Sequence, residues 1–224
     1  MKKLRLLPAV LGLMAIFSSC QKESMNNPVT DNNNEAQLRS EANQATARKN
    51  SEAADFQAQW KQQIESNRNP RTITETAISL PIFKSLVAAV VKTDLAGVLA
   101  TPGLNATVFA PTDAAFAKLP TPFNNASNIN AISDPAQIAA LKNILLYHVL
   151  GTQVTSNQIP SGSSNAVTLK PAGSANDNTI YFSKNFGVLL VNGNSLVLLP
   201  NVAASNGVIH VIDTVLVPPE RKKK

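Results

Sequence analysis

The chain has 224 residues, of which 44% are hydrophobic, 15% are charged and 5% are aromatic, and its formal net charge is +6. Lys2, Lys3 and Arg5 carry three of these positive charges, and the terminal run from Glu220 to Lys224 supplies a further net three. The remainder is close to neutral and poor in aromatics, which argues against a nucleic-acid-binding surface. Cys20 is the only cysteine, so a disulfide scaffold is excluded.

The first nineteen residues have the pattern of an export signal. Basic residues are followed by an apolar run from Leu6 to Phe17, which is shorter than the roughly 20 residues that span a membrane. Phe17-Ser18-Ser19-Cys20 resembles a bacterial lipobox. The resemblance implies cleavage after residue 19 and acylation of Cys20, which would place the mature chain on a membrane through two or three acyl chains.

The residues next to Cys20 bear on the destination of such a lipoprotein. Gln21 stands where an aspartate retains many lipoproteins in an inner membrane, so the resemblance favours the outer membrane. Lys22-Glu23 resembles the short charged signals that take some lipoproteins to the cell surface. The basic tail at 220–224 is expected to be a solvated chain end, with contact to phosphate-bearing lipids as the alternative.

Residues 20–70 are predicted to form a mostly flexible tether, because they are rich in Asn, Gln, Ser, Glu and Ala. Phe56, Trp60 and Ile64 are spaced four apart and predict one short helix with a single apolar stripe. We expect this helix to dock on the domain that follows or to fray, with a partner-binding helix as the alternative.

Residues 71–219 have the length of one domain with its own core. Apolar residues recur at helical spacing from Ile82 to Leu99 and predict a helix that begins at Pro81. A buried strand is expected over 106–110, and Thr112 or Asp113 can cap a helix after it. Asp134-Pro135 predicts the start of a second long helix.

After Gly151 the pattern changes to strands. The predicted strands cover 168–170, 179–183, 188–191, 196–199 and 208–217. Asn192-Gly193 predicts a hairpin, and Asn206-Gly207 is expected to supply positive backbone angles before the last strand. Helices followed by mostly antiparallel strands predict an α+β domain.

Three motifs resemble the signatures of fasciclin domains in the order that family uses. They are Ala106-Thr107-Val108-Phe109-Ala110-Pro111-Thr112-Asp113-Ala114-Ala115-Phe116, Leu145-Leu146-Tyr147-His148-Val149-Leu150, and the stretch from Asn206 to Pro219. The resemblance implies a compact wedge of two packed, mostly antiparallel β-sheets flanked by helices. It also implies a role in adhesion.

The resemblance makes Tyr147-His148 a candidate interaction motif, because the corresponding region of animal relatives is linked to integrin recognition. A Tyr-His pair among apolar residues is more simply a packed core element with its polar tips hydrogen-bonded. The other signature residues are expected to be structural: Thr112, Asp113, Asn206, Gly207, His210 and Asp213.

The sequence contains few residues in patterns that could bind a metal or catalyse a reaction. His148 and His210 are the only histidines, and two histidines make an incomplete zinc set. His210 and Asp213 are three apart on a predicted strand, which sends their side chains to opposite faces. No phosphate loop, dinucleotide fingerprint or nucleophile elbow is present. We therefore expect no catalytic residue, no metal and no cofactor.

The sequence thus predicts a lipid-anchored interaction module of the bacterial outer membrane, with the periplasmic face and the cell surface as the two alternatives for its position. The expected partners are the membrane, through Cys20, and an unidentified protein or glycan on another cell or matrix, but not nucleic acid. The alternative is an accessory module that binds an extracellular glycan or another small ligand.

Overall fold

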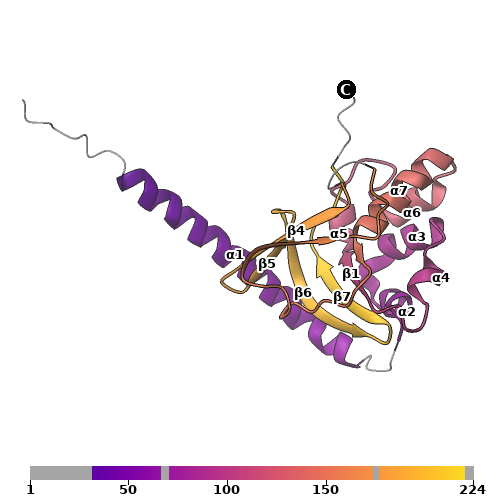
Figure 1. Ribbon diagram of the computed structural model, residues 1–224, viewed down its shortest axis with the longest axis horizontal. Coiled ribbons are helices and arrows are strands. Elements are labelled where there is room, and N and C mark those ends of the chain that lie inside the picture. Colours follow the sequence, from indigo (N-terminus) through magenta and orange to yellow (C-terminus); the bar gives the residue numbers. More distant parts are fainter. Residues whose placement is uncertain (1–31, 67–70, 174–176, 220–224) are drawn as a thin grey trace, which may run out of the picture. The chain divides into compact units, whose positions relative to one another are not determined.

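The computed structural model describes residues 32–66, 71–173 and 177–219 (Figure 1). The expected signal sequence, Cys20 and the basic tail lie outside these ranges. The chain divides into two compact units, Met1–Arg39 and Ser40–Lys224, and the second contains the domain. Among the described residues no single helix is long and apolar enough to cross a membrane, although the bent pair Ile73–Ser79 and Pro81–Lys92 has the required length and composition.

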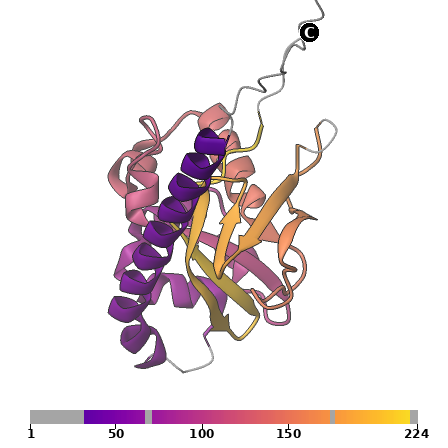
Figure 2. The same ribbon diagram turned by 90° about the vertical axis from the view of Figure 1, so that its left-hand side faces the viewer.

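Helix α1 (Asn32–Ser66) replaces much of the flexible segment predicted between residues 20 and 70. It is 35 residues long, and good helix formers such as Ala, Glu, Gln and Lys sustain it beyond the predicted apolar stripe. From Ser40 onward it belongs to the domain unit (Figure 2). Phe56 and Ile64 pack against the core, and the Gln57 amide donates to the carbonyl of Leu198 at 3.0 Å.

The helices of the domain lie before its first strand and between its first and second strands. They are α2 (Ile73–Ser79), the 3₁₀ turn η1 (Pro81–Phe83), α3 (Lys84–Lys92), α4 (Ala96–Leu99), α5 (Asp113–Phe116), α6 (Ala126–Ala131) and α7 (Pro135–Tyr147). Asp134 caps α7 through a bond from the Ala136 N–H, which confirms the predicted start. The sequence did not predict α2 or α6.

The single helix predicted over 82–99 is wrong. The first turn of this region, η1, is 3₁₀, and α3 ends at Lys92. Two residues later Asp94 adopts a left-handed φ of 58°. A residue of this conformation just past a helix terminates it, and the usual signal is glycine or asparagine. Because aspartate occupies the position, the apolar periodicity concealed the break.

Seven strands form one mixed sheet in the order β2-β1-β7-β6-β5-β4-β3. Their bounds are β1 (Ala106–Pro111), β2 (Val149–Leu150), β3 (Gly162–Val167), β4 (Thr179–Asn185), β5 (Val188–Val191), β6 (Ser195–Ala204) and β7 (Gly207–Ile212). Among the strands in the described ranges, only β1 and β7 pair in parallel. Asn192 and Gly193 both have positive φ in the β5–β6 hairpin, as predicted.

The sheet is continuous, so the two packed sheets implied by the resemblance are not shown. One strand, β6, serves both halves, because its beginning pairs with β5 and its remainder pairs with β7. Register shifts between Val197, Leu199 and Val202 bend it. Phe109 of β1 meets Phe182 of β4 at 5.7 Å between ring centroids, although three strands separate these two in the sheet. The sheet therefore curls until its halves face each other.

The strand predicted at 168–170 is wrong. The third strand lies just before it, at Gly162–Val167, in a Gly, Ser and Asn sequence with little intrinsic β preference. Its pairing with β4 over six residues decides its conformation. Tertiary pairing of this kind leaves no local signal in the sequence.

Three groups of apolar side chains fill the domain. The largest lies between the helices and the strands β1 and β7, and includes Phe83 and Phe116. The second fills the inside of the curled sheet around Phe109, Tyr147 and Phe182. The third lies on the outer face, where Phe56 of α1 covers β5 and β6. Strands β1 and β7 are buried along their whole length.

Candidate functional site

Tyr147, the first residue of the candidate interaction motif, lies at the end of α7 and is 2% exposed. Its hydroxyl donates to the carbonyl of Thr179 at 2.7 Å and accepts from the Asn192 side-chain amide at 3.2 Å. Burial raises the pKa of Tyr147, while the bond from Asn192 opposes that shift. The hydroxyl thus joins α7 to strand β4 and to the turn of the β5–β6 hairpin.

His148 follows as the C-cap of α7 and is also 2% exposed. The backbone N–H of Leu216 donates to its Nε2 at 2.8 Å, which requires the proton on Nδ1, 2.8 Å from the Ile144 carbonyl. Burial lowers the pKa of His148 to about 4, and the bond to Ile144 opposes part of this shift. The imidazole is therefore neutral, and it ties α7 to the segment after β7.

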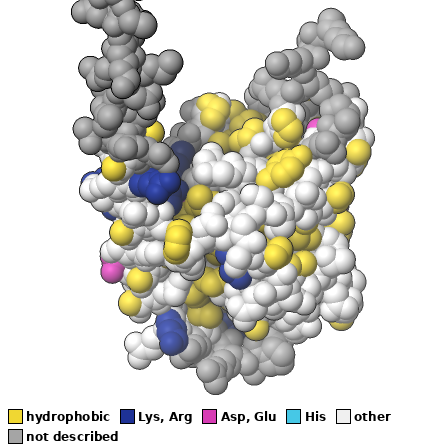
Figure 3. Space-filling model, turned by 60° about the vertical axis from the view of Figure 1, so that its left-hand side comes forward, with side chains coloured by type: hydrophobic (Ala, Val, Ile, Leu, Met, Phe, Trp, Pro, Cys, Tyr) yellow, Lys and Arg dark blue, Asp and Glu magenta, His cyan; other side chains and the backbone are white. Residues whose placement is uncertain are grey.

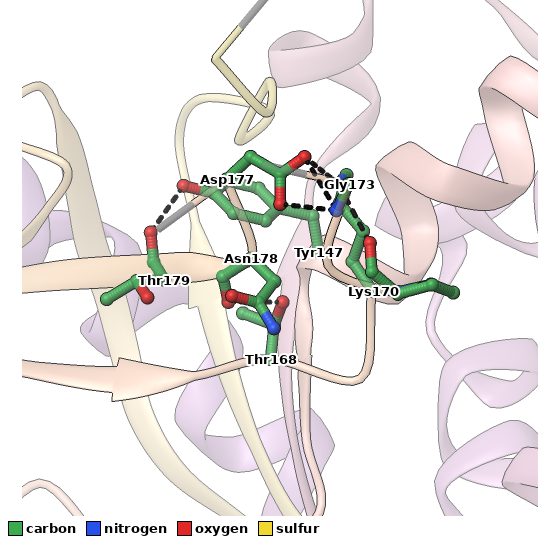
Figure 4. A network of polar contacts seen from close by, with 8 residues as sticks. Tyr147, Thr168, Lys170, Gly173, Asp177, Asn178 and Thr179 are labelled. Carbon is green, nitrogen blue, oxygen red and sulfur yellow. Dashed lines mark hydrogen bonds and ion pairs between the residues drawn. The ribbon is translucent and has the colours of Figure 1, made fainter. Parts of the chain in front are cut away.

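A polar network holds the loop between β3 and β4 near Tyr147 (Figure 4). Lys170 and Asp177 form an ion pair at 3.0 Å, with side chains 11% and 5% exposed. The same carboxylate accepts from the backbone N–H of Gly173, and both the N–H and hydroxyl of Thr168 donate to the Asn178 carbonyl. Sequence reasoning missed these residues, since an ion pair within a loop has no periodic signal.

Thr112 and Asp113 take two different structural roles. The Thr112 hydroxyl caps α5 by accepting from the Ala115 N–H. Asp113 instead reaches another helix, where its carboxylate accepts from the N–H of Ser85 at 2.7 Å, near the start of α3. One side chain thus begins α5, and the next fixes α3 against it.

Asn206 is completely buried and connects three segments. Its carbonyl oxygen accepts from the Ile73 N–H at 2.9 Å, and its amide nitrogen donates to the carbonyls of Leu99 and Thr101, each at 2.9 Å. The side chain therefore satisfies backbone groups at the start of α2 and around the end of α4.

The prediction that Asn206-Gly207 turns through positive backbone angles is wrong. Neither residue has a positive φ. A Cβ at Gly207 would instead meet the carbonyl oxygen of Ala106 and lie 2.9 Å from Ile73 Cδ1. Glycine is required because β1 approaches the backbone closely, not because the chain turns.

His210 lies inside the curled sheet with no exposed surface and stacks on Phe109 at 5.3 Å between ring centroids. Its Nδ1 accepts from the Asn201 N–H at 3.2 Å, and its Nε2 donates to the Val154 carbonyl at 2.9 Å. Burial lowers the pKa of His210, with the Val154 bond in opposition. Both ring nitrogens are used by backbone groups.

Asp213 does not orient His210. It lies just beyond β7, and its carboxylate accepts from the Leu196 N–H at 2.8 Å. Within the ranges that the structure describes, no three His, Cys, Asp or Glu side chains cluster as a metal site would require. The signature residues are therefore distributed among structural bonds and are not assembled into one reaction centre.

A shallow apolar cavity of about 60 Å³ lies between α2, α3, α4 and the sheet. It is lined by residues such as Ala77, Leu86 and Val108, and Ile78 and Val91 at its border are 61% and 62% exposed. Cavities that enclose a small organic ligand have about 300 Å³ or more. This one is too small to enclose such a ligand.

The polar signature side chains of this α+β domain bond to backbone groups of the fold, so they act as parts of a scaffold. The chain belongs to the fasciclin domain family, which it matches over residues 81–218. This family is associated with adhesion and cell-surface proteins, and its domains are generally non-catalytic.

Individual relatives support this assignment. Protein sll1483 of Synechocystis is 40% identical over 148 residues, which cover 66% of this chain and 74% of that protein. The cell surface glycolipoprotein MPB83 of Mycobacterium bovis is 37% identical over 113 residues, or 50% of this chain and 44% of that protein. A FAS1 domain pair from the insect cell adhesion molecule Fasciclin I shares the fold, with a TM-score of 0.52, 20% identity, and coverage of 65% of this chain and 50% of that one.

Proposed function

We propose that this chain is a lipid-anchored, non-catalytic adhesion or interaction module of the bacterial outer membrane, exposed on the cell surface. The observation that carries the proposal is a fasciclin domain at residues 81–218 in a chain whose Cys20 ends a lipobox-like sequence. A relative named as a cell surface glycolipoprotein supports the same combination.

The geometry limits where a partner can bind. Tyr147 and His148 are each 2% exposed, so a partner cannot contact them without opening the fold. The proposed contacts must therefore come from exposed side chains. This removes the candidate interaction motif from direct recognition and leaves it the role of holding α7 to the sheet.

Cell experiments test the proposed location and role. Cells that express the full chain should lose the domain when treated with external protease, whereas a Cys20→Ser chain should be absent from the membrane fraction. Deletion of the gene should lower attachment or biofilm mass, and the wild-type chain should restore it. Unchanged attachment after deletion, with the protein shown to be present in the parent strain, would contradict the adhesion role.

A glycan-binding role is the second candidate, and one surface favours it. The outer face of β3 and β4 presents Tyr181, 50% exposed, opposite Asn165 in the strand register, with Ser163 and Ser183 beside them. None of these side chains is charged. Figure 3 shows one face of the molecule, on which Lys and Arg side chains are scattered and Asp or Glu side chains are few. An exposed aromatic ring among amides and hydroxyls suits a neutral sugar, which offers C–H faces and hydroxyl groups.

A glycan array separates the two candidates. Specific binding that Tyr181→Ala abolishes, together with unchanged attachment after deletion, would replace the adhesion role with the glycan role. Tyr147→Phe is the matched control, because it removes a tyrosine hydroxyl that is buried and leaves the outer face intact. Binding that Tyr181→Ala leaves unchanged would contradict a glycan site on this face.

A further inference from the structure

The two edges of the sheet differ in how they are covered. At one edge, the carbonyl of Val149 in β2 accepts from the N–H of Leu169 at 2.7 Å, so the segment that directly follows β3 lies against that strand. At the other edge lies β3, Gly162–Val167. In the described part of the chain, no segment other than β4 forms a backbone ladder with it.

The register identifies which backbone groups of β3 face outward. Thr168 pairs with Asn178 through an N–H···O bond of 2.8 Å, and hydrogen-bonded pairs alternate along antiparallel strands. The even-numbered residues of β3 therefore bond to β4. Tyr181, whose carbonyl accepts from Asn192 on the β5 side, agrees with this assignment.

The N–H and C=O groups of Ser163, Asn165 and Val167 consequently point away from the sheet. All three residues are exposed, Val167 to 63%. An edge strand is usually protected by a charge, a proline or a bulge. Over its six residues β3 contains none of these, because its sequence is Gly-Ser-Ser-Asn-Ala-Val and its register with β4 is regular.

We propose that β3 pairs antiparallel with β3 of a second copy of this chain, about a two-fold axis at Asn165. The register places Asn165 opposite its counterpart and Ser163 opposite Val167, twice. Each of these three pairs exchanges two backbone hydrogen bonds. No charged side chain is brought near its own copy, so the strand is self-complementary, as a closed two-fold interface requires.

The pairing is expected to be weak in solution and stronger on a surface. A single strand pair buries less than the roughly 1,000 Å² of a stable interface, which predicts dissociation constants of about micromolar to millimolar. Chains anchored in a membrane have a high effective concentration, so many such pairs can form on one surface at the same time. A second copy of the chain would then be the partner of the proposed adhesion module, and the cellular role of the pairing rests on that proposal.

Disulfide trapping tests the pairing directly in the full chain carrying Cys20→Ser, so that each new thiol is the only one. Asn165→Cys should form an intermolecular disulfide on mild oxidation, because directly opposed residues have Cα atoms about 5.5 Å apart. Tyr181→Cys is the matched control. It is exposed on the adjacent strand and would lie three strand spacings, about 14 Å, from its counterpart, which is beyond disulfide reach.

Opposite charges introduced at Asn165 give a second test, in which sedimentation measures self-association. Asn165→Lys and Asn165→Glu should each associate at least about tenfold more weakly than the wild type, and an equimolar mixture of the two should regain association. Asn165→Pro should also prevent association while the thermal midpoint stays within a few degrees, because its N–H faces outward and is not used by β4.

Several outcomes would overturn the pairing. These are a chain that remains monomeric at millimolar concentration, equal crosslinking of Asn165→Cys and Tyr181→Cys, or self-association that Asn165→Pro does not change. Binding of an unrelated extended peptide to β3 in a chain that does not self-associate would also replace the second copy as the occupant. These results are independent of attachment: if deletion lowers attachment but Asn165→Cys does not crosslink, only the pairing fails.

Discussion

The helix-covered half of the domain and its β3–β4 half use polar side chains in opposite ways. Around α2, α7, β1 and β7 the polar groups are buried, and Asn206, His148 and His210 each bond to backbone groups of other segments. On β3 and β4 the polar residues Ser163, Asn165 and Tyr181 are exposed. We therefore expect that substitutions in the helix-covered half change stability, whereas substitutions in the β3–β4 half change only binding.

Gly207→Ala should break the buried half most severely. The new Cβ would meet the Ala106 carbonyl, which belongs to the backbone of β1 and cannot move aside without disturbing the β1–β7 pairing. We expect a loss of about 4 kcal/mol in the free energy of unfolding, measured by urea denaturation. Gly97→Ala is the control, since a Cβ there meets nothing within 4 Å; equal losses for the two variants would contradict the close-approach argument.

Asn206→Ala should cost about 3 kcal/mol, because it leaves the Ile73 N–H and the carbonyls of Leu99 and Thr101 without their partner. Denaturant unfolding measures the loss. Asn165→Ala, which removes an exposed amide, is the matched control and should stay within about 0.5 kcal/mol of the wild type. Similar losses for both asparagines would erase the difference between the two halves.

The buried histidines should make the domain acid-sensitive. The folded pKa of His148 is about 4 and the ordinary value is 6.5, so between these values the unfolded chain binds a proton that the folded chain does not. Stability is therefore fully present above pH 6.5 and falls by about 2 to 3 kcal/mol as the pH drops toward 4. His210, whose pKa is also lowered, acts in the same direction. In urea titrations at several pH values, His148→Gln should show a shallower fall; an unchanged slope would exclude His148 as its source.

Tyr181→Ala should have the smallest effect on stability, within about 0.5 kcal/mol, because half of the side chain is already exposed. Thermal unfolding compares it with Tyr147→Phe, which removes two buried hydrogen bonds and should cost about 1 kcal/mol. A larger loss for Tyr181→Ala than for Tyr147→Phe would reverse the proposed contrast between the halves.

The parts of the fold predicted correctly are those with strong local signals. Asp134-Pro135 marks the start of α7, and Asn192-Gly193 marks the β5–β6 hairpin, because capping and turn geometry depend on a few adjacent residues. The end of α3 at Lys92 and the strand at Gly162–Val167 have no such signal. The first depends on an aspartate in a glycine-like conformation, and the second depends on a partner strand whose paired residues lie 12 to 22 positions further along the chain.

The same distinction applies to the candidate site. The sequence motifs identified Thr112, Asp113, Asn206 and His210 as signature residues, and the structure supplied their bonding partners. Those partners are backbone groups as far as 133 residues away, as for Asn206 and Ile73. Because backbone N–H and C=O groups are the same at nearly every position, no pattern of side chains in the sequence could have identified these partners. The Lys170–Asp177 pair escaped prediction for a related reason, since only the folded loop brings the two charges together.

By itself, the sequence determined the family, the α+β class and the residues of the signature motifs, because these follow from local residue choice and spacing. Only the tertiary structure decided that Gly207 is needed for a close approach, that Tyr147 and His148 are enclosed, and that the seven strands form one curled sheet with β3 at an open edge. The physical reason is that burial, close contact and strand order depend on segments far apart in the chain. Local propensity and periodicity describe only neighbours.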